Sequence, residues 1–368
     1  GRSYSCRIRA PATCPPLDRT EPEHGPGSLP SEKSRNFGSE ASREFRITEK
    51  NPGEFPITNH SATYHQPLET SELVLLFPLP EMPELAEVEL ARRIWEPGSG
   101  QKIILLESHP KTRVYRDTAA QEIQVNLVGK AMVASHTHGK RLIFGFAERS
   151  NAASVIYLEL HLGMSGRLFV AAPDHRPGKH DHFVLKTKSL SLVYSDYRQF
   201  GRVYLHEPDT KPWETLPTEV LDKKFTLPYL RQLTARRNRT SLKALLLDQA
   251  IFPGVGNWMA DEICWRLCCF PGAPLQEIDL ASIRRVSRQV CRGALHHVAD
   301  KNSPRDGEKG FAPGSYVENV PPRSWLFQHR WKAGGSCPRC HSLLERSTIA
   351  TRTTAWCPQC QPPTSSEA

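Results

Sequence analysis

The chain has 368 residues, of which 38% are hydrophobic, with a mean hydropathy of −0.48 and a net charge of +9 at pH 7. This length suits two or three domains of ~100–200 residues each, and the longest apolar run, residues 73–79, is too short to predict a membrane-spanning helix. The positive charge favours a polyanionic partner, most commonly nucleic acid, although a basic protein without such a partner also fits.

Residues 1–81 differ in composition from the rest of the chain. They hold 11 of the 31 prolines. Their 9 Lys and Arg against 11 Asp and Glu give this segment a net charge of −2, so the remainder of the chain has a net charge of +11. Such a segment buries too little apolar surface to offset chain entropy, so we expect disorder. The first methionine is Met82, which favours upstream sequence translated in frame, with initiation at Met82. A regulatory tail and a transit peptide are the alternatives, and the acidic residues disfavour the transit peptide.

Residues 82–212 are predicted to form one domain that begins with a helix and continues in strands. The helix covers 83–95, because a proline stands at its first position, acids fill its first turn and an apolar face recurs at helical spacing. Short β-branched or aromatic runs separated by turn residues then predict a β-sandwich or barrel. These runs are 103–106, 141–146, 155–160, 183–185 and 192–194.

The remainder of the chain is predicted to be helical and then rich in cysteine. Residues 213–300 carry amphipathic patterns at 229–234, 241–248, 257–268 and 281–298. A loop rich in glycine, proline and charge follows at 301–324. Residues 325–362 form a compact cysteine module, and 363–368 are a tail.

Two Cys-x-x-Cys pairs give the most specific local signal. Cys337 and Cys340 are followed, after sixteen residues, by Cys357 and Cys360. Two such pairs predict one tetrahedral Zn²⁺ held by four thiolates, and because no position is left open the metal is structural. Disulfides are the alternative, which a reducing compartment disfavours. Between the pairs, the polar hairpin that carries Arg352 suits phosphate contact, or else is a solvated turn.

The motifs that remain follow the order of one known family. Residues 82–89, Met-Pro-Glu-Leu-Ala-Glu-Val-Glu, resemble the start of the formamidopyrimidine-DNA glycosylase family. Each further motif is weak alone, but the ordered set is specific: Gly139-Lys140, the His-Leu-Gly-Met-Ser-Gly of 161–166, the Asp-Tyr-Arg-Gln-Phe-Gly of 196–201, and the Gly-Val-Gly-Asn of 254–257. The resemblance covers 82–362. It implies an α+β multidomain fold with an N-terminal catalytic β-sandwich, a helical helix–two-turn–helix domain and a C-terminal zinc finger.

The chemistry of such an enzyme needs an amine that attacks the sugar of a damaged nucleotide. A secondary amine forms an iminium at the anomeric carbon, which permits elimination of the phosphates. Proline supplies this amine only at a chain N-terminus, where it titrates near ~8, so Pro83 would be the first residue of the mature protein. Glu84 would protonate the opening sugar ring, Glu87 would orient the site, and the resemblance makes Lys140 catalytic. The alternative without this chemistry is that Pro83 only starts the helix, Glu84 and Glu87 are ordinary acids of its first turn, and Lys140 is a surface lysine.

The resemblance also implies DNA contacts. An enzyme that extrudes a base must fill the vacated space, and Met164, Arg198 and Phe200 match the family's space-filling residues, although a methionine or phenylalanine more often belongs to a core. Asn257 is expected to cap its helix and contact phosphate at the helix N-terminus. Lys243 is expected to reach the DNA backbone.

Three features depart from the family pattern. Ala86 replaces a common proline, Tyr197 and Gln199 replace the more usual residues around Arg198, and the loop 300–322 does not align with the family's lesion-recognition segment. The departures around Arg198 bear on the partner-base preference, and the loop bears on lesion specificity.

The resemblance implies a bifunctional DNA glycosylase and abasic-site lyase of base excision repair. It would excise 8-oxoguanine and formamidopyrimidines from double-stranded DNA and then nick the strand by β,δ-elimination. It would act as a monomer with one structural zinc, in a bacterial cytoplasm in association with the nucleoid. Leu85 and the three space-filling residues favour this purine-acting branch. The alternatives are an endonuclease VIII-like enzyme for oxidised pyrimidines, or a damage-binding protein without catalysis if residues 1–81 are retained. A zinc-ribbon protein would explain only the cysteines and the charge.

Overall fold

The computed structural model of the chain describes residues 83–116, 118–148, 154–300 and 320–363. All of them belong to one compact unit. The predictions for 1–81, for 301–319 of the loop and for 364–368 of the tail lie outside the described residues. Within the described part, none of the helices combines the length and apolar character needed to cross a membrane.

The first helix, α1, spans Leu85–Ile94 and begins two residues later than predicted. Its N-cap residue Glu84 has extended backbone angles (φ −106°, ψ −176°), so the helical turn starts only after it. The apolar face that the sequence predicts is buried. At the other end Trp95, the C-cap residue, is also fully buried.

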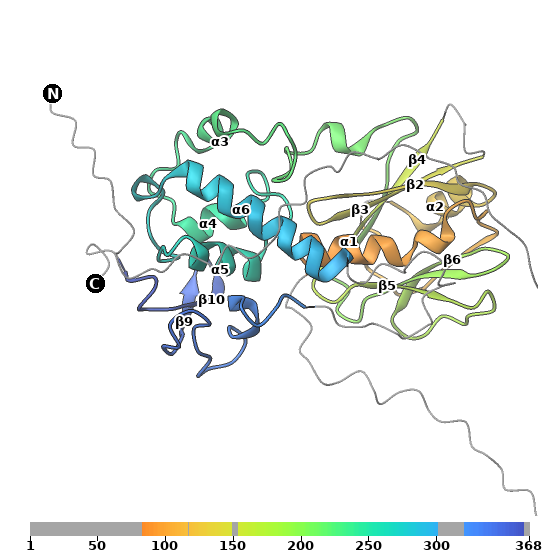
Figure 1. The fold of residues 1–368 in the computed structure, drawn as a ribbon. Helices are drawn as coiled ribbons and strands as arrows, with labels where there is room; N and C mark the ends of the chain where they lie inside the picture. Colours follow the sequence, from red (N-terminus) through yellow and green to blue (C-terminus); the bar gives the residue numbers. More distant parts are fainter. Residues whose placement is uncertain (1–82, 117, 149–153, 301–319, 364–368) are drawn as a thin grey trace, which may run out of the picture. The chain divides into compact units, whose positions relative to one another are not determined.

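Two four-stranded antiparallel sheets follow and confirm the β-sandwich (Figure 1). One sheet has the order β1-β6-β7-β5 and the other β2-β3-β4-β8. Trp95 lies between them, since its ring is 4.9 Å from Phe144 of β3 and 6.4 Å from Phe183 of β6. The strands are β1 Leu105–Ser108, β2 Ala131–His138, β3 Arg141–Ala147, β4 Ile156–His161, β5 Arg167–Ala171, β6 Asp181–Lys186, β7 Ser191–Ser195 and β8 Arg202–Leu205.

Four elements of this domain carry too weak a pattern to be predicted from sequence: β2, β5, β8 and the helix α2, Ala120–Leu127. In β2 a shift in register between Met132 and Ala134 interrupts the period-two alternation that identifies a strand. In α2 only Ile123 and Leu127 are buried, so its apolar face is narrow.

The next domain is helical, as the sequence predicts. Polar caps start three of its helices, because Thr226, Ser241 and Asp279 each accept hydrogen bonds from backbone N–H groups of the first turn. The last helix does not run continuously to 298, since α-helical geometry gives way to a π-helical turn at Leu295–Ala299. The α-helices are α3 Leu227–Thr234, α4 Leu242–Leu247, α5 Asn257–Arg266 and α6 Leu280–Ala294. The short 3-10 turns are η1 Glu96–Gly98, η2 Pro212–Glu214, η3 Leu275–Glu277 and η6 Leu326–Gln328.

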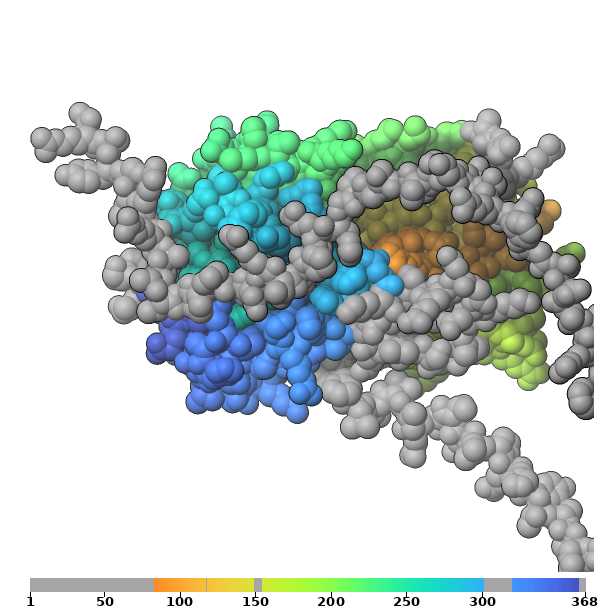
Figure 2. Space-filling model, viewed as in Figure 1, coloured from red at the N-terminus to blue at the C-terminus, as the bar shows by residue number. Residues whose placement is uncertain are grey.

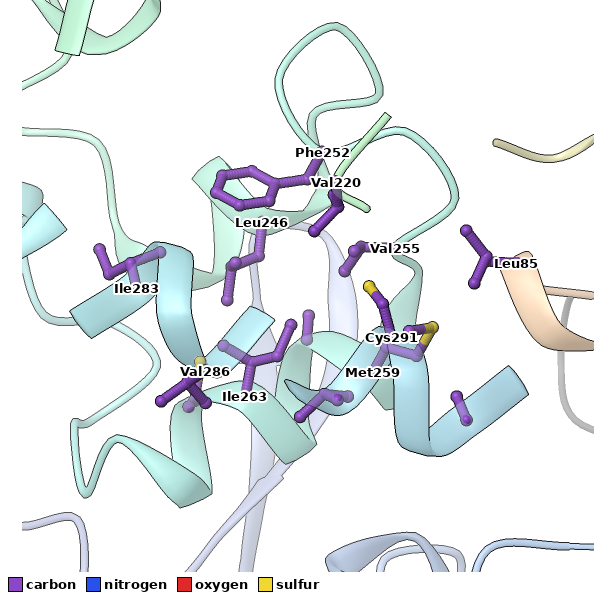
Figure 3. Packing of buried hydrophobic residues seen from close by; sticks show 14 of the residues in the cluster. Leu85, Val220, Leu246, Phe252, Val255, Met259, Ile263, Ile283, Val286 and Cys291 are labelled. Carbon is purple, nitrogen blue, oxygen red and sulfur yellow. The ribbon is translucent and has the colours of Figure 1, made fainter. Parts of the chain in front are cut away.

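An apolar cluster joins α1 to the helical domain (Figure 3). It contains Leu85 of α1 together with Val255 and Met259 beside and within α5. The backbone N–H of Leu85 also donates to the carbonyl of Gly254 at 3.0 Å. Gly254 has φ +86°, and a side chain there would come within 2.8 Å of Leu85, so only glycine lets the two elements approach this closely.

The C-terminal segment contains a hairpin of β9, Glu345–Ile349, and β10, Arg352–Trp356. The two turn residues, Ala350 and Thr351, have φ of 51° and 61°, as in the type I′ turns that join twisted strands. The C-terminal segment, blue in Figure 2, packs against α6. A Cβ atom on Gly293 of α6 would come within 2.7 Å of the Trp325 ring.

Candidate active site and nucleic-acid interface

A pocket forms where α1, the loop after β4, the start of α5 and the C-terminal hairpin meet. Four of its residues were predicted from sequence to be functional, and three were not. The lining consists of Glu84, Met164, Asn257, Trp258, Arg330, Trp331 and Arg352.

Glu84 lines this pocket with only 1% of its surface exposed. Its carboxylate accepts the backbone N–H groups of Gly256 (2.8 Å), Trp258 (2.8 Å) and Met259 (3.2 Å), which form the N-terminal turn of α5. Burial raises the pKa of Glu84, and nearby Lys140 and these N–H donors oppose the rise. The site therefore holds an acid whose proton affinity is increased but whose position is fixed.

Glu87 lies one turn further along α1 and contacts both Glu84 and Trp258. One carboxylate oxygen accepts the backbone N–H of Glu84 at 3.1 Å, and the other accepts the indole N–H of Trp258 at 3.2 Å. Burial, followed by repulsion from Glu84, raises the pKa of Glu87 to about 7. Two carboxyl groups with raised pKa thus belong to Glu84, which directly follows Pro83, and to Glu87, which binds the Glu84 N–H, and such pairs are typical of proton-transfer sites.

Lys140 enters this site from the turn between β2 and β3. Burial lowers its pKa, whereas attraction to Glu84 and Glu87 opposes the shift and repulsion from Arg352 adds to it. Gly139 has φ +58° and donates its backbone N–H to Glu219 at 2.8 Å, which anchors the turn to the start of the helical domain. The turn therefore brings Lys140 to the carboxylates of a helix more than 50 residues earlier in the chain.

Pro83 lies directly before Glu84 and is partly exposed. Its carbonyl carbon is bonded to the Glu84 nitrogen, whose N–H is held by Glu87. In the sequence as printed, the Pro83 nitrogen is in a peptide bond with Met82. The free secondary amine that the chemistry requires exists only in a chain that lacks this peptide bond and begins at Pro83.

The three expected space-filling residues lie on two loops that one carboxylate ties together. Met164 follows β4, and Arg198 and Phe200 follow β7. Asp196, fully buried, accepts the Ser165 hydroxyl next to Met164 and the backbone N–H of Gly201 next to Phe200 (2.8 Å). The Arg198 guanidinium stacks over the Phe200 ring at 4.8 Å, and Phe200 is 48% exposed. Exposed apolar and cationic side chains on an anchored loop suit insertion between bases.

Asn257 has a different role from the expected cap. Gly256 is the N-cap residue of α5, and the first N–H groups of that helix bind Glu84 instead of being left free for phosphate. The Asn257 side chain donates to the carbonyl of Thr353 in β10 at 3.0 Å. Among the described residues its buried side-chain oxygen has no partner, and the residue lines the pocket beside exposed Arg352.

The structure corrects the expectation that Lys243 reaches the DNA backbone. Its side chain is 0% exposed, and its ammonium group is paired with Asp261, also 0% exposed. Arg330 binds the same carboxylate at 2.7 and 2.9 Å, and the backbone N–H of Ala355 adds a fourth contact at 3.1 Å. Lys243 therefore joins α4 to α5 instead of meeting phosphate, and the shared Asp261 joins α5 to the C-terminal segment.

The four predicted cysteines converge, with all sulfur atoms within 4.8 Å of one another. The separations of 3.3 Å between Cys340 and Cys357 and 3.9 Å between Cys337 and Cys360 bracket the ~3.8 Å edge of a tetrahedron with metal–sulfur distances of ~2.3 Å. The indole N–H of Trp265 points to the Cys337 sulfur at 3.3 Å, a contact that suits a thiolate ligand. The donor set fits a metal ion that prefers sulfur.

Sequence reasoning missed Trp258, Arg330, Trp331 and Asp261. Trp258 directly follows the Gly-x-Gly-Asn motif, and this adjacency was the available signal. Arg330 and Trp331 stand next to each other outside any motif, and aromatic residues there are ordinarily assigned to a core. Only the packing of the C-terminal segment against α5 brings them to the pocket.

The chain matches two family models in succession. Residues 82–203 match the formamidopyrimidine-DNA glycosylase N-terminal domain, and residues 216–303 match the formamidopyrimidine-DNA glycosylase H2TH domain. Among curated relatives, the formamidopyrimidine-DNA glycosylase of Thermomicrobium roseum is 33% identical, with 76% of this chain and 99% of the relative aligned. That of Geobacter metallireducens is 32% identical, over 76% of this chain and all of the relative.

Solved structures agree with this result. A crystal structure of Lactococcus lactis formamidopyrimidine-DNA glycosylase, non-covalently bound to DNA that contains an abasic site, is 26% identical and aligns with a TM-score of 0.62 over 76% of this chain and all of that chain. A mutant of the same enzyme in complex with DNA that contains Fapy-dG gives the same identity and TM-score. The matches in family model, sequence and fold coincide, and the chain therefore belongs to the formamidopyrimidine-DNA glycosylase family, whose members are DNA glycosylases of base excision repair.

Proposed function

We propose that this chain excises oxidised purines, such as 8-oxoguanine and formamidopyrimidines, from duplex DNA and then cuts the strand by β,δ-elimination. The observation that carries the proposal is that Pro83 stands one peptide bond from Glu84, a buried acid with raised pKa in a pocket rimmed by Arg352. The Lactococcus lactis structures with abasic-site and Fapy-dG DNA support the same substrate class.

The reaction would begin at the Pro83 nitrogen. In a chain that starts at Pro83, this secondary amine bonds to C1′ of the damaged nucleotide, and the base leaves with the bonding electron pair and takes up a proton. Glu84 then protonates the ring oxygen as the sugar opens, which leaves an iminium between Pro83 and C1′. The raised pKa of Glu84 suits this step, because a carboxyl group must retain its proton near neutral pH to donate it.

The iminium would make strand cleavage possible. It withdraws electrons from C1′, so that a proton is lost from C2′ and the 3′-phosphate leaves. A second elimination releases the 5′-phosphate, and hydrolysis of the iminium restores the amine. Lys140, which Glu84 and Glu87 attract and Arg352 repels, would contact the base or an adjacent phosphate during these steps.

The remaining predicted residues would bind the distorted duplex. Met164, Arg198 and Phe200 would fill the space left by the extruded base, with Arg198 pairing to the orphaned partner base. Asn257 and Arg352 would contact phosphate at the pocket mouth. One structural zinc on the four cysteines would hold the hairpin that carries Arg352. We further propose that the protein works as a monomer in a bacterial cytoplasm, in line with its bacterial relatives.

Two measurements on the naturally expressed protein test the proposal. Mass spectrometry is expected to show a mature chain that starts at Pro83, since the family model begins at Met82. Borohydride is expected to trap that chain covalently on duplexes with 8-oxoguanine, but not on undamaged duplex. A chain that keeps residues 1–82 and still traps would refute Pro83 as the nucleophile. If residues 1–82 are retained and the chain does not trap, a damage-binding protein is the better description. A preference for oxidised pyrimidines would favour the endonuclease VIII-like alternative.

A further inference from the structure

Trp258 contacts both carboxylates of the site through two different N–H groups. Its backbone N–H donates to Glu84 at 2.8 Å, and its indole N–H donates to Glu87 at 3.2 Å. The backbone N–H of Glu84 completes a closed ring by donating to the second oxygen of Glu87 at 3.1 Å. Because the Glu84 nitrogen is bonded to the carbonyl carbon of Pro83, this ring also orients the peptide plane that carries Pro83.

The Trp258 indole is held rigidly enough to act as a fixed donor. Only 1% of the residue is exposed, and its ring packs edge-on against Phe327 at 5.0 Å and tilted against Trp325 at 6.4 Å. Both partners lie on the C-terminal segment, from which η6 packs against α5. A donor with so little freedom imposes one orientation on the carboxylate that accepts from it.

The backbone N–H groups of Glu87 and Glu84 favour the ionised form of the Glu87 carboxylate, and the Trp258 indole adds to them. Glu84 repels this carboxylate, and Lys140 from the β2–β3 turn attracts both carboxylates. On α6, Cys291 lies near Glu84, and burial raises the pKa of its thiol to about 12, so it stays neutral. The Trp258 indole N–H is the one side-chain donor to Glu87 among the described residues.

From this arrangement we infer that Trp258 is a positioning residue for the proposed reaction, in which its two N–H groups fix Glu84 and Glu87 relative to Pro83. The indole N–H also stabilises the ionised form of Glu87, which accepts two hydrogen bonds. The inference rests on the proposed function for its catalytic meaning, but the hydrogen bond itself is tested without any activity measurement.

The first test uses carbon NMR of the full chain with carboxyl-labelled glutamate. Glu87→Gln identifies the Glu87 signal by its loss. In the unaltered chain that signal is expected to titrate near pH 7, and in Trp258→Phe the midpoint is expected to rise by about one pH unit, because a hydrogen bond to the charged form is lost while the ring is kept. An unchanged midpoint would overturn the inference.

Trp95→Phe is the matched control. Trp95 is also fully buried, and its indole nitrogen has no partner among the described residues, so the same chemical change is expected to leave the Glu87 midpoint in place. A shift of equal size in Trp95→Phe would mean that general loosening of the fold, not the hydrogen bond, moves the titration.

A second measurement avoids substitution altogether, in case Trp258→Phe does not fold. In nitrogen-labelled full chain, the indole N–H signal of Trp258 is expected to shift with pH at the same midpoint as the Glu87 carboxyl group, whereas the Trp95 signal stays constant. An indole signal of Trp258 that ignores the Glu87 titration would contradict the contact.

The mature enzyme supplies the catalytic readout. If Glu87 must be ionised for its positioning role, the acid limb of kcat against pH in Trp258→Phe moves to higher pH by the same unit, with KM changed little. A uniform loss of kcat at every pH would indicate a packing effect only. If the enzyme is inactive in all forms while the NMR shifts occur, the proposed function fails and the hydrogen-bond inference stands.

Discussion

At the scale of single residues, Glu84 shows how burial and hydrogen bonding act in opposite directions. Burial favours the protonated carboxyl group, whereas Lys140 and three backbone N–H donors favour the ionised group. The net effect is a raised pKa, which means that burial dominates. A raised pKa favours the protonated form, which an acid that protonates the sugar ring must supply.

Glu84→Gln is expected to reduce base excision by the mature enzyme by about 10²- to 10⁴-fold, because the amide has no acidic proton to transfer. Binding of damaged duplex should change far less, since the amide is almost isosteric. Single-turnover cleavage and a separate binding titration distinguish the two effects. Glu122→Gln on α2, an exposed acid remote from the pocket, is the control and should behave as the unaltered enzyme. Full activity in Glu84→Gln would remove it from the mechanism.

At the scale of elements, α5 connects three parts of the chain. Its N-terminal turn binds Glu84 of α1, and its middle presents Asp261 to Lys243 of α4 and to Arg330 and Ala355 of the C-terminal segment. Asp261 thus compensates two buried cations at once. The pocket depends on this connection, because Arg330 and Arg352 reach it only while the hairpin is docked on α5.

Asp261→Asn is expected to lower the free energy of unfolding by about 3–5 kcal/mol, because it leaves Lys243 and Arg330 buried without a counter-charge. Lys243→Met should cost less, since Asp261 keeps Arg330 and the Ala355 N–H. Chemical unfolding of the two variants measures the difference. Equal losses would show that the two cations do not share the carboxylate as described.

Cys337→Ser is expected to abolish tight metal binding and weaken binding to duplex DNA, because three thiolates no longer complete a closed tetrahedral site. Metal analysis of the purified protein, with a binding titration on damaged duplex, checks both effects. Cys269→Ser is the control, since Cys269 lies outside the four-sulfur group and its hydrogen bond to the Leu267 carbonyl suits a hydroxyl as well. Unchanged metal content in Cys337→Ser would refute a site made of four cysteines.

At the scale of the whole molecule, charge separates the two parts of the chain. Residues 82–368 carry a net +11 and residues 1–81 a net −2, so the attraction to a polyanion resides in the part that matches the family. Basic residues at the pocket mouth, such as Arg352, add a local contribution. Long-range attraction of this kind guides association with DNA but carries no sequence information.

Affinity for damaged duplex is expected to fall on the order of 10²-fold between 50 and 200 mM salt, as about four phosphate contacts would require. A plot of log Kd against log salt concentration gives the number of contacts. Arg352→Ala should reduce the slope by about one contact, whereas Arg323→Ala, on the C-terminal segment away from the pocket residues, serves as a comparison. A slope near zero would contradict binding dominated by phosphate.

Much of the architecture followed from local signals in the sequence. Period-two and helical patterns located α1, most core strands and the helices of the second domain, because burial of one face imposes those periods. The cysteine spacing located the four-sulfur group, since paired knuckles need that spacing. The helix α2 buries only a narrow apolar face, and the register of β2 is interrupted, so neither element has a hydrophobic periodicity clear enough to be identified from sequence.

Family membership and the residue types at the site were thus determined by the sequence by itself, because ordered short motifs are readable along the chain. The partners of each side chain were decided only in three dimensions. Lys243 turned inward to Asp261, the first turn of α5 bound Glu84, and Trp258 met Glu87 more than 170 residues away along the chain. The physical reason is that burial and hydrogen bonding are satisfied between elements distant in sequence, and no local pattern encodes which of them will meet.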